Sequence, residues 1–209
     1  MRFVWCAAAA ACLVLTGCSS PEPAKPKAAE TSGAPNLFKV KLDTSKGPVV
    51  IEIHRDWAPI GADHLYDLVK HGYYDGSRFF RVLPGFMAQF GLAADPAVTA
   101  KWVNARLPDD PVTQHNTVGM LTYATAGPAS RTTQLFINMA DNSRLDAQGF
   151  APLGIVISGM DAVMSLYSGY GEGAPSGAGP DQQTITNQGN EYLQAHFPML
   201  DFIKTATVE

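Results

Sequence analysis

Two polar side chains interrupt the apolar stretch "RFFRVLPGFMAQFG", which runs from Arg78 to Gly91. Arg81 lies in its first strand-length run of apolar residues, and Gln89 lies in the second. A guanidinium carries five N–H donors in a fixed fork, and a glutamine amide offers both donors and an acceptor. A packed core has little use for either group. Their presence indicates a surface that presents fixed hydrogen-bond donors beside apolar side chains.

The period of a strand predicts which neighbours these two residues have. Successive side chains of a strand point to opposite faces of the sheet. Arg81 is therefore expected to share a face with Phe79, and Gln89 to share a face with Met87. Phe86 lies at the turn, where alternation does not fix its direction.

The same mixture of residue types returns further along the chain. In "TQLF", Gln134 and Phe136 fall on one face of a predicted strand. One arginine, two glutamines and several large apolar side chains could form a shallow, mostly apolar groove with fixed donors. The alternative is a barrel wall whose polar residues face solvent, and periodicity alone leaves both interpretations open.

Other kinds of chemistry have little support in the sequence. The chain has five histidines: His54, His64, His71, His115 and His196. They form neither an i, i+4 pair nor an HExxH pattern, so we expect no metal site and no cofactor. The glycine-rich stretch "GYGEGAPSGAGP" follows a helix and not a strand, which favours a surface loop over a phosphate cradle. A G-x-S-x-G nucleophile motif does not occur in the chain.

Alternation of apolar and polar residues predicts the strands that position Arg81 and Gln89. Residues 37–42 and 49–54 form a hairpin around "SKGP", with a Gly-Pro turn. The "RFFRVLPGFMAQFG" stretch forms two strands around the turn Leu83-Pro84-Gly85. Further strands are predicted at residues 118–125, 133–139, 150–158 and 199–209.

Only two segments have a convincing helical pattern. Residues 58–72 carry apolar Ile60, Leu65, Leu68 and Val69 at helical spacing, and residues 159–169 predict a second, short helix. Residues 92–116 predict a polar surface excursion with one short helical piece, and residues 189–198 a helical turn. Many short strands with two helices indicate a mainly β fold, either a barrel or a sandwich.

Composition bounds the class of protein. A chain of 209 residues fits one sizeable domain with appendages. A hydrophobic fraction of 46% and a charged fraction of 16% are typical of a globular protein. The net charge is -4 and the basic residues are scattered, which argues against a nucleic-acid partner.

The N-terminal segment predicts export and membrane attachment. Residues 1–17 have one charge followed by a short apolar run, which is typical of a signal peptide. The run ends in "LTGC", which resembles the lipobox of bacterial lipoproteins and makes Cys18 the lipidation site. The alternative is an ordinary signal with a chance cysteine. Cys6 and Cys12 would leave with the signal, so no disulfide, thiolate catalyst or zinc-thiolate site is expected.

Three parts of the chain follow from this interpretation. Residues 1–17 are the signal peptide, residues 18–36 are the lipidated cysteine with a Pro- and Ala-rich tether, and residues 37–209 are the folded domain. The predicted location is the cell envelope, outside the cytoplasm. Ser19 beside the lipidated cysteine favours the periplasmic face of the outer membrane if the host is Gram-negative.

Three segments of the domain resemble the signature segments of the cyclophilins. They are "FFRVLPGFMAQFG" from Phe79, "LTYATAGPASRTTQLFI" from Leu121 and "LDAQGFAPLGIVISGMDAV" from Leu145. The resemblance extends from about Phe38 to Tyr167. It implies a closed eight-stranded antiparallel β-barrel capped by two helices. It also implies a peptidyl-prolyl cis-trans isomerase that acts on proline-containing polypeptides without a cofactor, and nothing in the sequence suggests more than a monomer.

The resemblance assigns roles to individual residues. Arg81 matches the catalytic arginine, and Gln89 matches the polar residue that holds it. Phe86, Met87, Phe136 and Leu145 match the pocket for the proline ring. The remaining matches are Gln134 beside the arginine and the substrate-binding rim of Ala124, Thr125 and Ala126.

Three departures from the family pattern bear on these roles. Arg144 stands where many members have a tryptophan, so tight inhibition by cyclosporin is not expected. Gly149 or Phe150 stands where they have a histidine, and Phe150 could supply the lost apolar wall. Thr125 replaces a common asparagine. Two alternatives to an isomerase remain open from the sequence: a non-catalytic lipoprotein that binds proline-containing segments as a chaperone or scaffold, and a purely structural lipoprotein.

Overall fold

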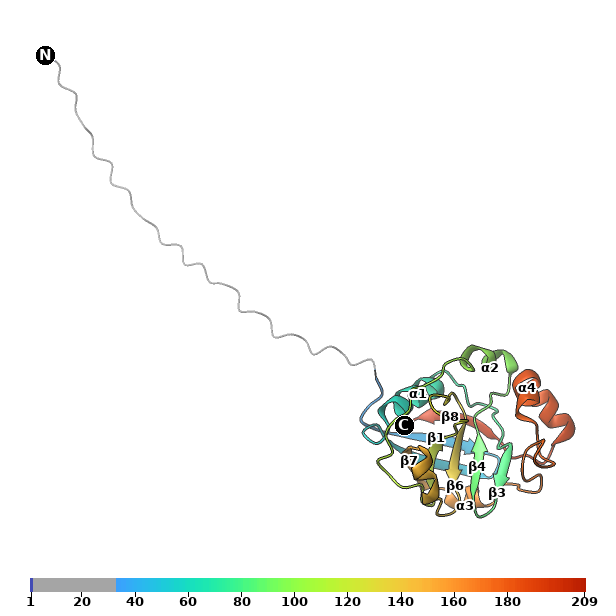
Figure 1. Cartoon of the computed structure of the whole chain (residues 1–209). Helices are drawn as coiled ribbons and strands as arrows, with labels where there is room; N and C mark the ends of the chain where they lie inside the picture. Colours follow the sequence, from blue (N-terminus) through green and yellow to red (C-terminus); the bar gives the residue numbers. More distant parts are fainter. Residues whose placement is uncertain (2–32) are drawn as a thin grey trace. The chain divides into compact units, whose positions relative to one another are not determined.

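The computed structural model describes Met1 and residues 33–209 (Figure 1). The predicted signal peptide, the lipidation site Cys18 and most of the predicted tether lie outside the described residues. The last residues before the first strand contact the domain, since Ala34 N–H donates to Asp63 (2.8 Å) and Arg55 N–H donates to the Asn36 carbonyl (2.9 Å). In the part that the structure describes, no helix has both the length and the apolar character needed to span a membrane.

Eight strands form one antiparallel sheet, in the order β3-β4-β6-β5-β7-β2-β1-β8. The predicted mainly β fold with eight antiparallel strands is therefore confirmed. The strands are β1 (Leu37–Thr44), β2 (Gly47–His54), β3 (Arg81–Leu83), β4 (Met87–Phe90), β5 (Met120–Tyr123), β6 (Leu135–Asn138), β7 (Pro152–Ser158) and β8 (Ile203–Val208).

The sheet curls into a half-barrel and does not show the closed barrel that the sequence predicts. β3 and β8 stand at its two ends and do not pair with each other as strands. The residues just before them are joined by an isolated antiparallel bridge between Arg78 and Phe202, and Phe79 N–H donates to the Asp201 carbonyl (3.0 Å). Ile203, the first residue of β8, also bonds the segment before β3, donating to the Ser77 carbonyl and accepting from Gly76 N–H (2.8 Å each), so the two ends of the sheet meet through that segment and not through β3.

The concave interior holds the main core. Phe38, Val40 and Leu42 of β1 are buried, as are the alternate residues Val49, Ile51 and Ile53 of β2, as the period of two predicts. The turn between them differs from the prediction. Thr44 pairs with Gly47, so Ser45 and Lys46 form the turn and the Gly-Pro pair begins β2. Gly47 takes a φ of +119°, which only glycine adopts without strain.

Helices cover the curled sheet and extend it. Leu65, Leu68 and Val69 of α1 (Pro59–Lys70) are buried as predicted, whereas Ile60 is 37% exposed because it lies in the first turn, away from the sheet. The second predicted helix is shorter, α3 (Met160–Met164). The predicted surface excursion contains α2 (Pro96–Trp102). A 3-10 helix, η1 (Ser143–Gln148), precedes β7.

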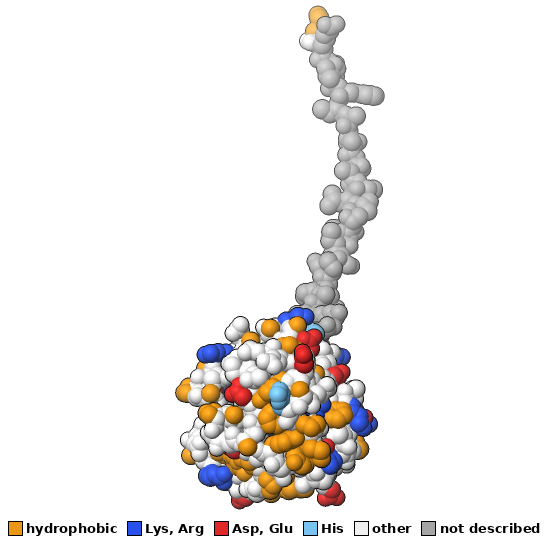
Figure 2. All heavy atoms as spheres, turned by 90° about the vertical axis from the view of Figure 1, so that its right-hand side faces the viewer, with side chains coloured by type: hydrophobic (Ala, Val, Ile, Leu, Met, Phe, Trp, Pro, Cys, Tyr) orange, Lys and Arg blue, Asp and Glu red, His pale blue; other side chains and the backbone are white. Residues whose placement is uncertain are grey.

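The C-terminal helix is longer than the predicted helical turn. α4 (Gln182–His196) begins seven residues earlier, and Gly189 kinks it with non-helical φ and ψ. Figure 1 shows α4 beside α2 and near β3. Ile185 and Leu193 of α4 pack with Phe80 in a second apolar cluster, separate from the main core. Figure 2 views this side of the molecule, where hydrophobic side chains gather and the few charged groups are scattered.

Candidate active site

The strand register places the residues of interest in one row across three strands. Arg81 of β3 pairs with Gln89 of β4, and Gln89 pairs with Phe136 of β6. Met87 lies two residues before Gln89 and therefore on the same face. This face is the outer face of the half-barrel, since Val82 and Ala88, which alternate with Arg81 and Gln89, belong to the main core.

The prediction that Arg81 and Phe79 share one face of the strand is wrong. Phe79 points into the main core with Val82, whereas Phe80 belongs to the cluster under α4. Regular alternation begins only at Arg81, where β3 starts, because residues 78–80 follow an irregular path outside any strand. The period of two therefore applies only from Arg81 onward.

All eleven predicted substrate-site residues line a single groove of about 480 Å³. This volume lies in the range of pockets that bind small molecules or peptide side chains. Four residues that the sequence did not single out also line it: Ser130, Thr132, Gln148 and Gln182. Gln182 opens α4, so the C-terminal region of the chain contributes to the groove.

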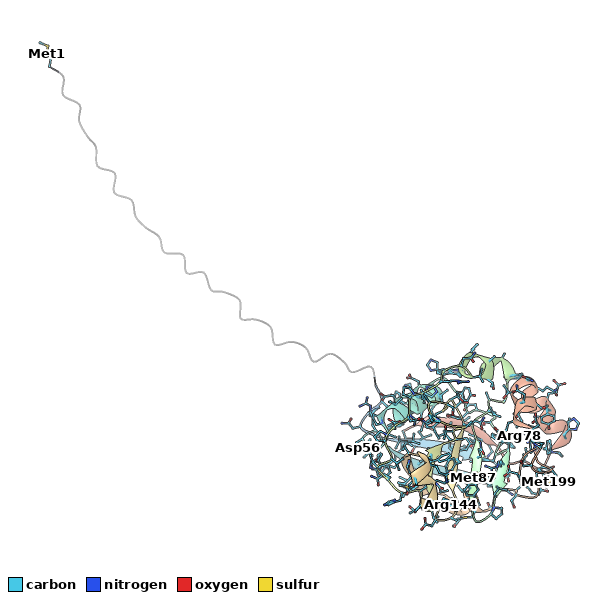
Figure 3. The ribbon with its side chains drawn as sticks, viewed as in Figure 1. Met1, Asp56, Arg78, Met87, Arg144 and Met199 are labelled. Atoms are coloured by element: carbon cyan, nitrogen blue, oxygen red, sulfur yellow. The ribbon has the colours of Figure 1, made fainter. Side chains whose placement is uncertain are left out.

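The apolar part of the groove has its own small cluster. Met87, Phe136 and Leu145 are buried, and Phe86 and Phe150 pack against them at the edge. The ring of Phe150 meets that of Phe136 edge-on, with centroids 5.8 Å apart. The sequence left open whether Gly149 or Phe150 occupies this place, and in the structure Phe150 forms the apolar wall. Figure 3 labels Met87 in this region of β4.

A chain of hydrogen bonds fixes the polar part of the groove. Arg81 Nη1 donates to Gln89 Oε1 (3.1 Å), and Gln89 Nε2 donates to Gln134 Oε1 (2.8 Å). Gln89 is only 6% exposed, so its amide would be costly to leave without partners. The expected contact between Gln89 and the arginine is present.

The rim formed by residues 124–126 is internally bonded. Ala124 N–H donates to the Gln134 carbonyl (3.0 Å), and Ala126 N–H donates to Ser130 Oγ (2.9 Å). Thr125 Oγ1 is bonded within the same loop, to Gly127 and Ser130. The N–H groups of Ala124 and Ala126 are therefore already bonded within the protein.

Arg144 lies at the edge of the apolar cluster. Its guanidinium carbon is 5.0 Å from the centroid of the Phe86 ring, and that of Arg81 is 5.8 Å from the same centroid. Arg144 Nη1 also donates to Asn142 (3.1 Å). Figure 3 shows Arg144 and Met87 in the same part of the domain. A second cation thus lies over the Phe86 ring at the edge of the apolar cluster.

A further residue that the sequence did not single out, Glu172, contacts Arg81. Its carboxylate forms a bidentate ion pair with Arg81, with Nε–Oε1 at 2.6 Å and Nη2–Oε2 at 2.7 Å. These hydrogen bonds from Arg81 lower the pKa of Glu172 below its ordinary value, although partial burial opposes the shift. Glu172 lies in the glycine-rich stretch that the sequence predicts to be a surface loop, and its partner Arg81 is 91 residues away in the sequence.

The structure is a curled antiparallel sheet that carries an arginine beside an apolar groove on its outer face. Comparison with known proteins shows which family has this arrangement. Residues 39–187 match the family described as cyclophilin type peptidyl-prolyl cis-trans isomerase. The chain belongs to this family and is a cyclophilin-type peptidyl-prolyl cis-trans isomerase.

Similar curated proteins and solved structures agree with this assignment. A peptidyl-prolyl cis-trans isomerase-like 1 of Rhizopus delemar is 38% identical over 134 residues, which are 61% of this chain and 79% of that protein. A peptidyl-prolyl cis-trans isomerase of Acinetobacter baylyi is 38% identical over 130 residues, 59% of this chain and 69% of the relative. The crystal structure of a cyclophilin type isomerase of Cryptosporidium parvum shares the fold, with a TM-score of 0.60 at 19% identity, covering 83% of this chain and 98% of that one.

Proposed function

We propose that the chain accelerates rotation about X-Pro bonds through a non-covalent mechanism in which Arg81 stabilises the twisted amide. The observation that carries this proposal is the row formed by Arg81, Gln89 and Phe136, which sets a guanidinium beside an apolar pocket. Arg81 is a strand residue, and Gln89 and Glu172 both hold its side chain. The donor therefore has a fixed position relative to a bound ring.

The chemistry of the amide explains why this arrangement suffices. Rotation about an X-Pro bond breaks the conjugation of the amide, with a barrier of ~18–20 kcal/mol and times of tens to hundreds of seconds. No bond to the protein has to form, so the site needs neither a nucleophile nor a proton relay. Groups that bind the twisted amide more strongly than the planar forms lower the barrier.

The apolar cluster supplies the grip on the proline ring. Met87, Phe136 and Leu145 form its floor, and Phe86 and Phe150 its sides. The Cryptosporidium parvum cyclophilin was also solved in the presence of the dipeptide Ala-Pro, which supports a proline-containing ligand here. With the ring held there, the guanidinium of Arg81 donates to the prolyl carbonyl oxygen or to the nitrogen lone pair that appears on rotation.

Replacing Arg81 tests the mechanism. Fixed donors in a partly dry site each contribute about 10²–10³ in rate by analogy with oxyanion holes. We expect Arg81→Ala to lower kcat/KM for a short X-Pro peptide by roughly this factor. The peptide should still bind, because the apolar pocket is intact. Isomerisation at the wild-type rate in a folded Arg81→Ala protein would rule out the mechanism, and peptide binding without rate enhancement in the wild type would indicate a binding module.

The physiological substrates that we propose are envelope or secreted proteins. The support is the predicted signal peptide and the lipobox-like "LTGC", which together would hold the domain on a membrane outside the cytoplasm through Cys18. The tether that follows would give a monomeric domain freedom to reach unfolded chains near the membrane surface.

A further inference from the structure

The ion pair between Glu172 and Arg81 joins the glycine-rich loop to the proposed catalytic residue. The side chains are partly buried, with 38% of Glu172 and 21% of Arg81 exposed. Bidentate pairing of a carboxylate with a guanidinium fixes orientation as well as distance, because two parallel N–H bonds allow only one relative arrangement. The pair therefore restrains the rotation of the guanidinium.

Glu172 bonds one edge of the Arg81 guanidinium, and the terminal edge lies toward the groove. The carboxylate takes Nε and one N–H of Nη2, which form one edge of the guanidinium. Gln89 takes one N–H of Nη1. A guanidinium has five N–H groups; the second N–H of Nη1 donates to Met87 Sδ, a weak acceptor, and one N–H of Nη2 has no partner among the described residues. Nη1 lies 3.8 Å from Met87 Sδ in the floor of the groove, which shows that the terminal edge is directed into the groove.

The loop around Glu172 is shaped to hold its carboxylate. Gly173 N–H donates to Glu172 Oε1 (2.9 Å), and Gly179 N–H donates to the Glu172 carbonyl (2.8 Å). A Cβ on Gly179 would lie 2.7 Å from that carbonyl oxygen, and a Cβ on Gly177 would overlap it. Both positions therefore require glycine for the backbone to fold closely around Glu172. The glycine-rich stretch thus has a structural task that a flexible surface loop would not have.

From these contacts we propose that Glu172 is a positioning residue, which holds Arg81 with its terminal N–H groups toward the X-Pro amide. This inference rests on the role proposed for Arg81. An arginine side chain carries about 2 kcal/mol of rotamer entropy, so an unrestrained guanidinium would spend much of its time away from the productive orientation. Holding it in place before substrate arrives is the kind of preorganisation that makes a fixed donor effective.

The ionisation of Glu172 gives the inference a pH signature. Arg81 of β3 is the charged group that pairs with the carboxylate, Gln89 of β4 is neutral, and Asp181, which precedes α4, hydrogen-bonds Thr184 instead. Pairing with Arg81 lowers the pKa of Glu172. The ion pair is therefore intact above that pKa and is lost as the pH falls through it. Activity that depends on this ion pair is therefore expected to decline below pH 4.5, the ordinary pKa of a glutamate side chain.

The test compares Glu172→Gln and Glu172→Ala with the wild type on a short X-Pro peptide. Exchange spectroscopy by nuclear magnetic resonance follows the reaction without a coupled protease, so acidic pH is accessible. We expect both variants to lower kcat by roughly tenfold to hundredfold, since small misplacements of a reacting group have effects of this size. KM should change little. The acid limb of the pH profile should disappear in Glu172→Gln and persist in Glu191→Gln, a matched control on the exposed side of α4.

A double-mutant comparison separates this inference from the proposed mechanism. In an Arg81→Ala background, Glu172→Ala should have no further effect on kcat, because the residue that it positions is gone. If Arg81→Ala lowers kcat while Glu172→Gln does not, only the positioning role is wrong. An increase in kcat on replacing Glu172 would mean that the carboxylate competes with substrate, which also overturns the inference. If Arg81→Ala has no effect, the mechanism itself fails. Thermal unfolding of each variant shows whether the loop alone was disturbed.

Discussion

At the scale of single residues, Arg81 is one member of a hydrogen-bonded series that runs from Glu172 through Arg81 and Gln89 to Gln134. Each member is held by a neighbour on a different part of the chain. A guanidinium at the end of a flexible side chain becomes a directed donor only under such restraint. The orientation of the proposed donor therefore depends on the whole series.

Replacing Gln89 should disturb both of its neighbours. Gln89→Leu removes the acceptor of Arg81 Nη1 and the donor to Gln134 Oε1, and leaves this partly buried oxygen without that partner. We expect about 1–3 kcal/mol lower free energy of unfolding for the unpaired group. We also expect a fall in kcat of roughly tenfold from the loosened guanidinium. Urea unfolding and peptide exchange rates measure the two effects. Gln188→Leu, on an exposed position of α4, is the control and should change neither.

The sequence predicted some of these residues and missed others for a physical reason. Arg81 and Gln89 stand out because a polar side chain inside an apolar strand departs from a local pattern. Glu172 departs from no local pattern, since a glutamate among glycines is typical of any surface loop. Its role comes from a contact across 91 residues, which no period along the chain reports.

At the scale of elements, a buried aspartate connects the irregular segment to the helix and to the groove. Asp110 accepts from Ile60 N–H (3.0 Å) and Gly61 N–H (2.9 Å) in the first turn of α1, and from Arg131 Nη1 (3.0 Å). Arg131 ends the loop that carries the rim of the groove. Asp110 is 4% exposed although it lies in the polar excursion that the sequence assigned to the surface. The polar sequence around Asp110 predicts an exposed side chain, but its ion pair with Arg131 is buried.

Replacing Asp110 should lower the free energy of unfolding far more than replacing its neighbour Asp109. Asp110→Ala leaves Arg131 buried without its main partner and two N–H groups of α1 unsatisfied, so we expect about 3–5 kcal/mol lower free energy of unfolding. Asp109 is 40% exposed and 3.5 Å from Arg131, so Asp109→Ala should cost about 1 kcal/mol or less. Urea unfolding of the two variants measures the difference. Equal losses would show that Asp110 contributes no more than a surface pair.

At the scale of the whole molecule, the strand pattern and the signature segments predicted the fold well, and closure and the C-terminal region less well. Alternation defines which residues face the core, but it says nothing about whether the two ends of a sheet meet. The first half of α4 was missed because Gly189 and the polar run before it resemble a loop, whereas Asp181 caps it and Ile185 anchors it. The cap is a local contact, whereas the packing of Ile185 is a tertiary contact that overrides a weak local pattern.

Attachment to a membrane is the prediction that concerns the whole chain. If Cys18 is lipidated, the purified protein should start at Cys18 and carry the mass of its acyl chains, and labelled fatty acid should be incorporated in a bacterium that processes lipoproteins. Several acyl chains contribute ~0.8 kcal/mol per buried CH₂, which suffices for stable anchoring, so the protein should sediment with membranes. Cys18→Ala should abolish the label and leave kcat/KM of the isomerase unchanged. Cys12→Ala is the matched control, because that cysteine would be removed with the signal. Cleavage elsewhere without label would identify an ordinary secreted protein.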